Sequence, residues 1–486
     1  TPFFASVALI FFYLLIKSIY GSRNAFLSTI LLATFPVYIY YTARSMFHNV
    51  LLVSLLVISL YFAYKMVAEN KWKPGFFTWK LSHINWWSWL SAALAGVFLG
   101  LAIATRTSEL LWMLPAAGIL WLFNIKKIGV TKLAIFSAFT WLSLLPLFYW
   151  NQILYGAPLY GGYPEMNSSI ERIKQGGEGV LQSIWNINME TIIIWAEKIQ
   201  NAVFYFGFQP QLSQEMFLHY VVEMFPWLFW VGILGGFMFL QRIWEWEKEH
   251  YVYVLVYVVV SLILIYYYGS WEFHDNPDKS SFTIGNSYTR YWLPVYMGAL
   301  PWVSFLLGKL PEQLLRTDRT KLKVTKGEEE HFLRRWGRAL KKKSLWARMI
   351  TAVLLGILIY TSLYHVLYGS EEGLIRTAEK RRSLQTQYEE ILDITPSNAV
   401  IITQYHDKIL FPQRKVIVGD LQDKNMIENY VKLEEFLPVY YYNFTLPPRS
   451  VHYLNDNKLG EADLLLQEYK HINDTFTLYK LENIDN

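Results

Sequence analysis

Ten apolar stretches, each long enough to cross a lipid bilayer as an α-helix, occupy most of the first 370 residues of this chain. A spanning helix needs about 20 mostly apolar residues, because each residue adds only about 1.5 Å to its length. The stretches are 3–17, 24–42, 50–67, 87–105, 109–124, 131–149, 217–240, 251–268, 291–309 and 346–368. So many apolar helices could not share one water-soluble core. The pattern therefore predicts a polytopic α-helical membrane protein of about ten spans.

The composition favours the same conclusion. Hydrophobic residues make up 53% of the chain and charged residues only 17%, whereas an ordinary soluble domain has about 25% charged residues. The chain also has 20 Trp, 34 Tyr and 31 Phe, and aromatic rings favour the membrane–water interface. It has no cysteine, so disulfides are excluded and the redox compartment stays open.

Lysines and arginines in the connecting loops predict the orientation. Basic residues follow every odd-numbered span, and the loop 309–348 alone holds thirteen basic and five acidic residues. Such loops are cytoplasmic by the positive-inside rule. Anionic lipid headgroups explain this charge without a nucleic-acid partner. We therefore expect the turns 43–49 and 105–108, the loops 150–216 and 269–290, and everything after residue 369 to lie outside. Thr1 would also be outside, so we expect an odd number of spans, most simply one, before it.

The last part of the chain has a different character. A charged amphipathic stretch at 371–393 precedes strand-like runs at 398–403, 415–418 and 475–482 and helical patterns at 424–437 and 461–470. Alternating strand and helix signals predict a small extracytoplasmic α/β domain. The predicted division is a membrane domain, 1–369, and a soluble domain, 370–486, in a plasma or inner membrane. The sequence contains no phosphate loop, dinucleotide fingerprint, metal-spaced His/Cys cluster or nucleophile elbow.

Arg106 and Glu109 are the first candidate functional residues. A charge close to hydrocarbon is costly and needs a partner or a ligand. The two residues lie three apart in GLAIATRTSELLW, so they would share a face and pair if the helix continued through them. An interfacial pair of this kind should contribute about 1 kcal/mol or less to stability.

Two further arginines are expected at the same face. Arg44 shares the outer turn between the second and third spans with His48 and Asn49, and Arg290 opens the ninth span beside Tyr291. Three arginines at one membrane face can hold a phosphate by bidentate hydrogen bonds, which Arg makes better than Lys. Interfacial snorkelling or a local ion pair would explain the same arginines without a ligand.

Four segments carry a family resemblance. They are IYGSRNAFLSTILLATFPVYIYYTARSMFHN (19–49), GLAIATRTSELLWMLP, NQILYGAPLYGGY (151–163) and RYWLPVYMGALP (290–301). In this order they resemble motifs of the polyprenyl-phosphate-sugar-dependent glycosyltransferases of the GT-C class, the superfamily of protein O-mannosyltransferases and bacterial lipid A aminoarabinose transferase.

The resemblance implies a GT-C-like fold and an enzyme of the outer face. Such an enzyme moves a sugar from a polyprenyl-phosphate carrier to a protein, lipid or glycan acceptor, usually with inversion at the anomeric carbon. Arg106 would hold the donor phosphate, helped by Arg44 and Arg290, and Glu109 would orient Arg106 or the acceptor. The expected substrate residues are His48, Asn49, Asn151, Tyr155, Gly156, Pro158, Gly162, Tyr163 and Tyr291. A plain Gly/Pro turn would also explain the loop among them.

Several points stay open in the sequence. The family's general-base carboxylate is expected upstream of Thr1, and many members carry an Asp where this chain has Asn49. A neutral amide can accept a hydrogen bond but cannot act as a base or bind a metal strongly, so the sequence leaves two alternatives open: an enzyme with or without a divalent metal, and a divergent, inactive member of the family. Outer-loop residues could contact the acceptor or be ordinary solvated charges: Glu165, Glu272, His274, Asp275 and Asp278. The alternative function is a non-catalytic polyprenyl-lipid binder or a flippase-like transporter.

Overall fold

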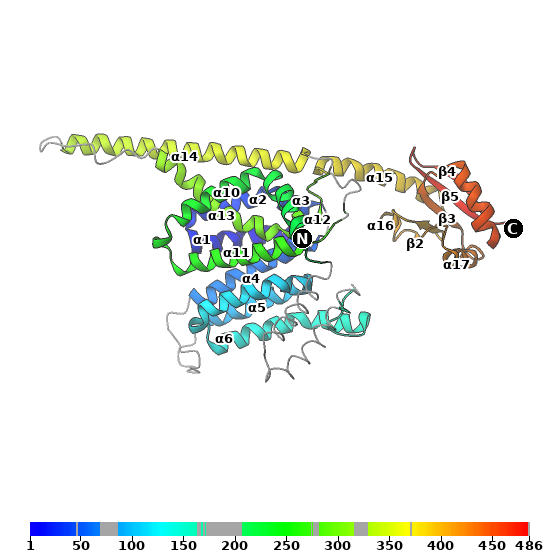
Figure 1. Cartoon of the computed structure of the whole chain (residues 1–486), viewed down its shortest axis with the longest axis horizontal. Helices are drawn as coiled ribbons and strands as arrows, with labels where there is room; N and C mark the ends of the chain where they lie inside the picture. The colour runs from blue at the N-terminus through cyan, green and yellow to red at the C-terminus, as the bar shows by residue number, and fades with distance from the viewer. Residues whose placement is uncertain are drawn as a thin grey trace. The chain divides into compact units, whose positions relative to one another are not determined.

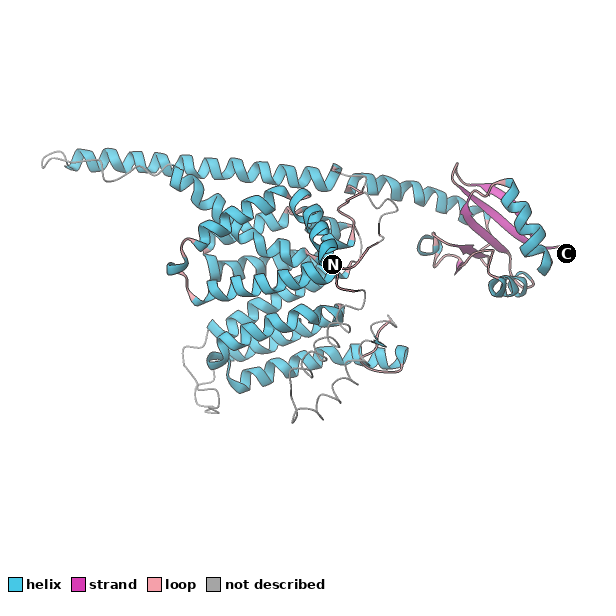
Figure 2. Cartoon of the chain, viewed as in Figure 1, coloured by secondary structure: helices cyan, strands magenta, loops and turns pink. Residues whose placement is uncertain are grey.

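The structure is a computed structural model, and it divides into two compact units, Thr1–Leu374 and Ile375–Asn486. It describes residues 1–44, 47–68, 86–162, 167–168, 171, 207–273, 275, 281–314, 329–369 and 372–484. Among these residues the first unit is helical, and all the strands lie in the second (Figure 2).

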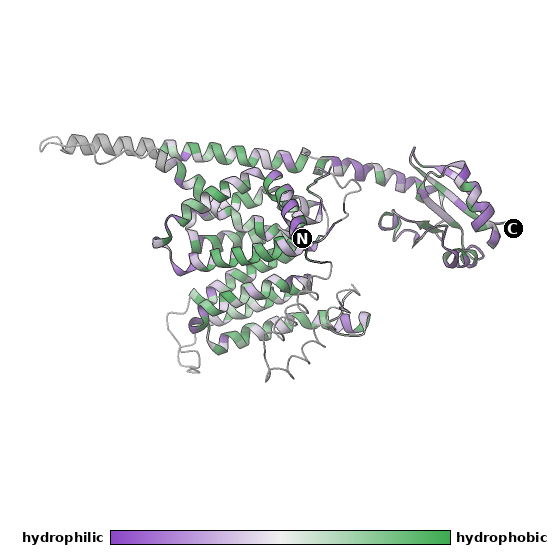
Figure 3. Ribbon diagram, viewed as in Figure 1, coloured by the Kyte–Doolittle hydropathy of each residue, from purple (hydrophilic) through white to green (hydrophobic). Residues whose placement is uncertain are grey.

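The helices of the first unit form a bundle (Figure 1). They are α1 (Pro2–Tyr20), α2 (Ser22–Ala33), α3 (Pro36–Ala43), α4 (His48–Ala68), α5 (Trp86–Thr105), η2 (Thr107–Glu109), α6 (Leu110–Tyr155), α9 (Pro210–Phe217), η4 (Leu218–Glu223), α10 (Pro226–Leu240), α11 (Lys248–Gly269), α12 (Ser287–Tyr291), α13 (Leu293–Leu314) and α14 (Glu329–Tyr368). Apolar residues cover most of the bundle, whereas hydrophilic residues are frequent on the second unit (Figure 3).

The chain is an integral membrane protein of the helical type. Its described residues contain seven helices long and apolar enough to cross a membrane, or up to nine if each of two bent helix pairs is one span. Every predicted stretch falls in one of these helices or in one of the two bent pairs. The count is below ten because α6 contains two of the predicted stretches, 109–124 and 131–149.

Helix α6 is interrupted at Gly129, whose φ of 66° and ψ of 170° are not helical. The half before Gly129 runs antiparallel to α11. Its far end reaches the start of α11, where Lys248 donates a hydrogen bond to Asn124. At its beginning, Glu109 accepts a hydrogen bond from Tyr268, near the end of α11.

The half after Gly129 packs on α5 in the same chain direction. A Cβ added to Gly96 would lie 2.3 Å from the carbonyl oxygen of Phe136, and one added to Gly100 would lie 2.5 Å from that of Thr140. Glycines permit such close helix contacts in membranes. Because α5 and α11 end on the same side, the two halves of α6 run in opposite directions, as two separate spans would.

Two predicted spans are bent rather than straight. The stretch 24–42 is divided between α2 and α3, which meet at 50° before Pro36, and 217–240 is divided at a 92° bend before Pro226. A proline cannot donate to the preceding turn, and it drives the residue before it out of the helical region. Each of these two stretches therefore consists of helices that meet at a bend, where the sequence predicted one helix.

Helix ends that were predicted to lie outside meet on one side of the bundle. Arg44 after α3 pairs with Glu372 beyond α14, and Arg106 after α5 lies over Tyr268 near the end of α11. We call the side that bears these four residues the Arg106 face.

The ends that were predicted to be cytoplasmic meet on the opposite side. There Nε2 of His250 lies 2.9 Å from the carbonyl oxygen of Ile19, and Nζ of Lys132 donates a hydrogen bond to the carbonyl oxygen of Met66. Lys248 also lies on this side, which we call the Lys248 face. The two faces agree with the alternating topology predicted from the loops.

The second unit is a small α/β domain, as predicted. Its five-stranded sheet has the order β2-β1-β3-β5-β4, where β1 pairs in parallel with β2 and β3, and β5 pairs antiparallel with β3 and β4. The strands are β1 (Val400–Thr403), β2 (Lys415–Val418), β3 (Val439–Phe444), β4 (Leu464–His471) and β5 (Phe476–Asn483). Its helices are α15 (Leu374–Ile394), α16 (Asp407–Leu410), α17 (Lys424–Glu434) and α18 (Pro448–Leu454).

Two assignments in this domain need correction. The stretch 461–470 was predicted to be helical but forms most of β4, and the prediction omitted β3. The residues of β4 have a mixed propensity, but Leu464 and Leu466 are buried at alternating positions against β5. Pairing with a neighbouring strand overrode the local helix preference.

Candidate functional site

Arg106 lies at the point where α5 ends, on the Arg106 face. Its backbone is extended, with φ −163° and ψ 97°, and the short helix η2 follows. Its Nε lies 2.9 Å from Oε1 of Glu109. The pairing that the sequence suggested is therefore present, although it runs across a turn and not along a continuing helix.

Glu109 is fully engaged by hydrogen-bond donors. Besides Arg106, the indole N–H of Trp112 and the hydroxyl of Tyr268 donate to its carboxylate. The side chains of Arg106 and Glu109 are only 13% and 5% exposed, so the pair is much more deeply buried than an interfacial pair was expected to be. Three donors in a buried site hold the carboxylate in one orientation.

Aromatic rings fix the position of the Arg106 guanidinium. It lies 4.2 Å from the centre of the Tyr291 ring and 5.7 Å from that of Tyr268, and the two rings stack on each other at 4.2 Å. Nη1 of Arg106 lies 3.4 Å from Nε2 of His48. The structure thus places His48 and Tyr291, both predicted site residues, beside Arg106.

Arg290 shares these aromatic neighbours. Its guanidinium carbon is 5.2 Å from the centre of the Tyr291 ring and 4.9 Å from that of Phe47, and Nη2 donates to the hydroxyl of Ser287. Within the described part of the chain, no carboxylate forms an ion pair with Arg290. Its charge is therefore held in place mainly by ring faces, which leave most of its donors available.

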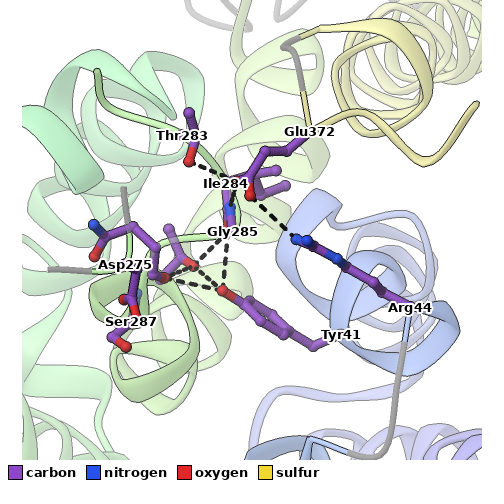
Figure 4. A network of polar contacts seen from close by, with 10 residues as sticks. Tyr41, Arg44, Asp275, Thr283, Ile284, Gly285, Ser287 and Glu372 are labelled. Atoms are coloured by element: carbon purple, nitrogen blue, oxygen red, sulfur yellow. Dashed lines mark hydrogen bonds and ion pairs between the residues drawn. The ribbon is translucent and has the colours of Figure 1, made fainter. Parts of the chain in front are cut away.

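Arg44 lies nearby in a separate polar network (Figure 4). Its Nη1 is 3.3 Å from Oε1 of Glu372, and its guanidinium lies 5.0 Å from the centre of the Tyr40 ring. Glu372 also accepts hydrogen bonds from Thr283 and from the backbone N–H of Gly285. In the same network, Asp275 accepts from the backbone N–H of Ser287, the residue to which Arg290 donates.

Asn49 does not join these contacts. Its side chain is 4% exposed in the first turn of α4, and its Oδ1 has no hydrogen-bond partner among the described residues. Nor does any group of three His, Asp or Glu side chains in the described ranges lie close enough to hold a metal ion.

The loop after α6 is a structured turn. Gly156 has a left-handed φ of 78°, and Asn151 donates to the carbonyl oxygen of Pro158. A Cβ on Gly162 would lie 3.1 Å from the hydroxyl of Tyr155. All of these contacts lie within the loop itself. They do not test its predicted role near the sugar, which stays a prediction. Tyr163, Glu165, His274 and Asp278 lie outside the described residues.

The sequence did not single out several residues of this face. Tyr268, Trp112, Thr283, Gly285 and Glu372 all contact the predicted arginines or Glu109, directly or through one partner. Of these residues, only Glu372 could have been recognised in the sequence, because it is an acidic residue just after the last apolar stretch. The others look like ordinary helix-end or loop residues in the sequence.

Comparisons with known proteins give one kind of match. No protein-family model matches the sequence, and no curated protein sequence matches it. The structure is similar to the crystal structure of ArnT from Cupriavidus metallidurans bound to undecaprenyl phosphate, with a TM-score of 0.47 and 10% identity over 98% of this chain and 82% of that one. The structure is also similar to the apo state of the same ArnT, with a TM-score of 0.45 and 11% identity over 99% of this chain and 82% of that one.

Both matches span nearly the whole of this chain. At about one identical residue in ten, no residue role can be carried from one chain to the other. The roles of the arginines therefore rest on their own contacts.

Proposed function

We propose that this protein is a membrane glycosyltransferase that moves a sugar from a polyprenyl-phosphate carrier to a protein, lipid or glycan acceptor. One observation carries the proposal: Arg44, Arg106 and Arg290, from three distant segments, gather at one end of an apolar helical bundle. An isoprenoid chain needs an apolar environment, and its phosphate needs cationic partners at interface depth. A cluster of arginines at a helix-bundle end meets both requirements.

In this proposal Arg106 and Arg290 bind the donor phosphate around the ring of Tyr291. A polyprenyl phosphate is already a good leaving group, so most of the rate enhancement can come from positioning and from stabilising the charge that develops on the phosphate. Glu109 is a positioning residue, because Arg106, Trp112 and Tyr268 already occupy its carboxylate. The general base is left to a carboxylate outside these residues, as the resemblance implies.

Release of the carrier separates the enzyme from the alternative, a non-catalytic carrier binder or flippase-like transporter. We expect purified protein, incubated with polyprenyl-phosphate-linked sugars and membrane extract as acceptor source, to produce free polyprenyl phosphate and a labelled acceptor. Chromatography of the lipid phase measures the first product. Binding of the intact donor without any release, over a panel of sugars, would contradict the transferase and favour the transporter.

We further propose that the Arg106 face and the second unit are extracytoplasmic. The basic segment 309–348 and the loop before α11 would then lie in the cytoplasm, as the positive-inside rule requires. The chain has no cysteine, so single introduced cysteines can be labelled without background.

Labelling intact cells with a membrane-impermeant maleimide tests this orientation. Cysteine at Asn457, an exposed position of the second unit, should react, and cysteine at Trp244, which is 95% exposed between α10 and α11, should react only after the cells are opened. The reverse pattern would place the Arg106 face in the cytoplasm.

A further inference from the structure

Three donors converge on the carboxylate of Glu372 (Figure 4). Nη1 of Arg44 lies 3.3 Å from Oε1, while the hydroxyl of Thr283 and the backbone N–H of Gly285 lie 2.6 and 2.8 Å from Oε2. A guanidinium, a hydroxyl and a peptide N–H around two anionic oxygens are also the donors that proteins use to bind phosphate. We call these three donors the Arg44 nest.

The loop part of the nest is held by contacts that do not involve Glu372. The buried hydroxyl of Tyr41 lies 3.1 Å from the carbonyl oxygen of Ile284 and 2.9 Å from that of Asn286. The side chain of Asn286 in turn accepts from the backbone N–H of Tyr288 and caps α12. The peptide that carries the Gly285 N–H is therefore oriented by its own neighbours, and it would keep its direction if Glu372 moved away.

Gly285 provides the space that the carboxylate occupies. A Cβ at this position would lie 2.0 to 2.6 Å from the carboxylate atoms of Glu372, which is too close for both to remain. Gly285 is not among the residues with a positive φ, so its backbone does not require glycine. What requires glycine here is room for an anion against the peptide N–H.

The Glu372 carboxylate can leave without opening the core of the bundle. The side chains of Arg44 and Glu372 are 28% and 24% exposed, so water reaches both partners. The nest also lies next to the site around Arg106 and Arg290, because Arg290 donates a hydrogen bond to Ser287, two residues after Gly285. An anion that replaced Glu372 would therefore lie on the same loop segment as Arg290.

We propose that the Arg44 nest is a phosphate-binding site and that Glu372 is an internal anion that occupies it until a ligand arrives. The inference rests on the proposed function, since it adds the nest to Arg106 and Arg290 as a binding site for the phosphate of the lipid carrier. Glu372 and that phosphate compete for the same donors, so the carrier must displace the carboxylate in order to bind. The contact between Glu372 and the nest is thus autoinhibitory.

Two variants that change the nest in opposite ways test the proposal. Glu372→Gln keeps the volume of the side chain and removes its charge, whereas Gly285→Ala puts a methyl group into the space that the anion occupies. Glu372→Gln should tighten the Kd for farnesyl phosphate, a short polyprenyl phosphate, on the order of tenfold, because the ligand no longer competes with a charged hydrogen-bond acceptor. Adding Gly285→Ala to Glu372→Gln should abolish this gain, because the added Cβ keeps any anion away from the Gly285 N–H. Adding Arg44→Ala to Glu372→Gln should abolish this gain. Gly356→Ala is the matched control, since nothing lies within 4 Å of a Cβ there.

Titration calorimetry in detergent gives the Kd, and the melting temperature of each variant shows whether it has folded. If wild-type protein binds farnesyl phosphate but Glu372→Gln leaves its Kd unchanged or weakens it, or keeps its gain when Gly285→Ala is added, the nest does not hold the phosphate and this inference fails while the proposed function stands. If neither wild type nor any variant binds the lipid, both fail. Inorganic phosphate is the second probe. If inorganic phosphate displaces farnesyl phosphate when both are present at the same concentration, the nest binds free phosphate and not the lipid carrier proposed here.

Discussion

Arg106→Ala is expected to lower the rate of sugar transfer by about a hundred- to a thousandfold, the usual effect of removing one preorganised donor to a developing negative charge. The guanidinium lies 4.2 Å from the centre of the Tyr291 ring and pairs with Glu109, so its direction is set before the substrate binds. Arg106→Lys should restore only part of the rate, because an ammonium cannot make a planar two-point contact. Carrier release from a labelled donor measures both variants.

The burial of Glu109 complicates this experiment. The sequence suggested that loss of Arg106 would change stability little, but the pair is nearly inaccessible to solvent. Removing one partner of a buried ion pair costs about 3–5 kcal/mol. The double variant Arg106→Ala/Glu109→Gln removes the uncompensated charge and should recover most of the melting temperature without recovering activity. A double variant as active as wild type would exclude Arg106 from phosphate binding.

Arg290→Ala is expected to reduce transfer about a hundredfold and to weaken binding of the carrier, with almost no loss of stability. Arg290 contacts Ser287 and the rings of Phe47 and Tyr291, so its removal leaves no carboxylate unpaired among the described residues. Lost ring contacts of this kind contribute about 1 kcal/mol or less. Kinetics together with thermal unfolding separates this variant from Arg106→Ala.

Arg242→Ala provides the control for charge alone. Arg242 lies just before α11 on the Lys248 face, 40% exposed, and its contact with Glu245 is 3.8 Å long. Its loss should change neither transfer nor melting temperature. Equal losses in Arg242→Ala and Arg290→Ala would show that the effect comes from general charge and not from a phosphate site.

The membrane spans could be predicted because hydrophobicity is a property of each segment by itself. Every predicted stretch falls in a helix or in a bent helix pair, including the two that meet at Gly129. The 92° bend before Pro226 was missed because the sequence on both sides of the bend is equally apolar. In the second unit, strand β4 was assigned as helix because its pairing with β5 is not visible in its own residues.

The arginines of the candidate site could be predicted for a similar reason: a charge at the end of an apolar stretch stands out. Their partners from distant parts of the chain could not be predicted. Arg106 and Glu109 are three residues apart, so spacing alone suggested their contact, but Tyr268 lies 159 residues from Glu109, and Tyr291 belongs to a third helix. The roles of Asn151, Tyr155, Gly156, Pro158 and Gly162 near a sugar stay predictions, because their contacts lie within their own loop.

By itself, the sequence determined that this chain is a helical membrane protein with a small α/β domain and that arginines lie at the ends of its spans. The tertiary structure alone decided how those arginines are used. It buried the Arg106–Glu109 pair beneath two tyrosines, left Arg290 on ring faces, and joined Arg44 to Glu372 across 328 residues of chain. Hydropathy acts locally and can be read along the chain, whereas the pairing of charges depends on which helix ends the packing brings together.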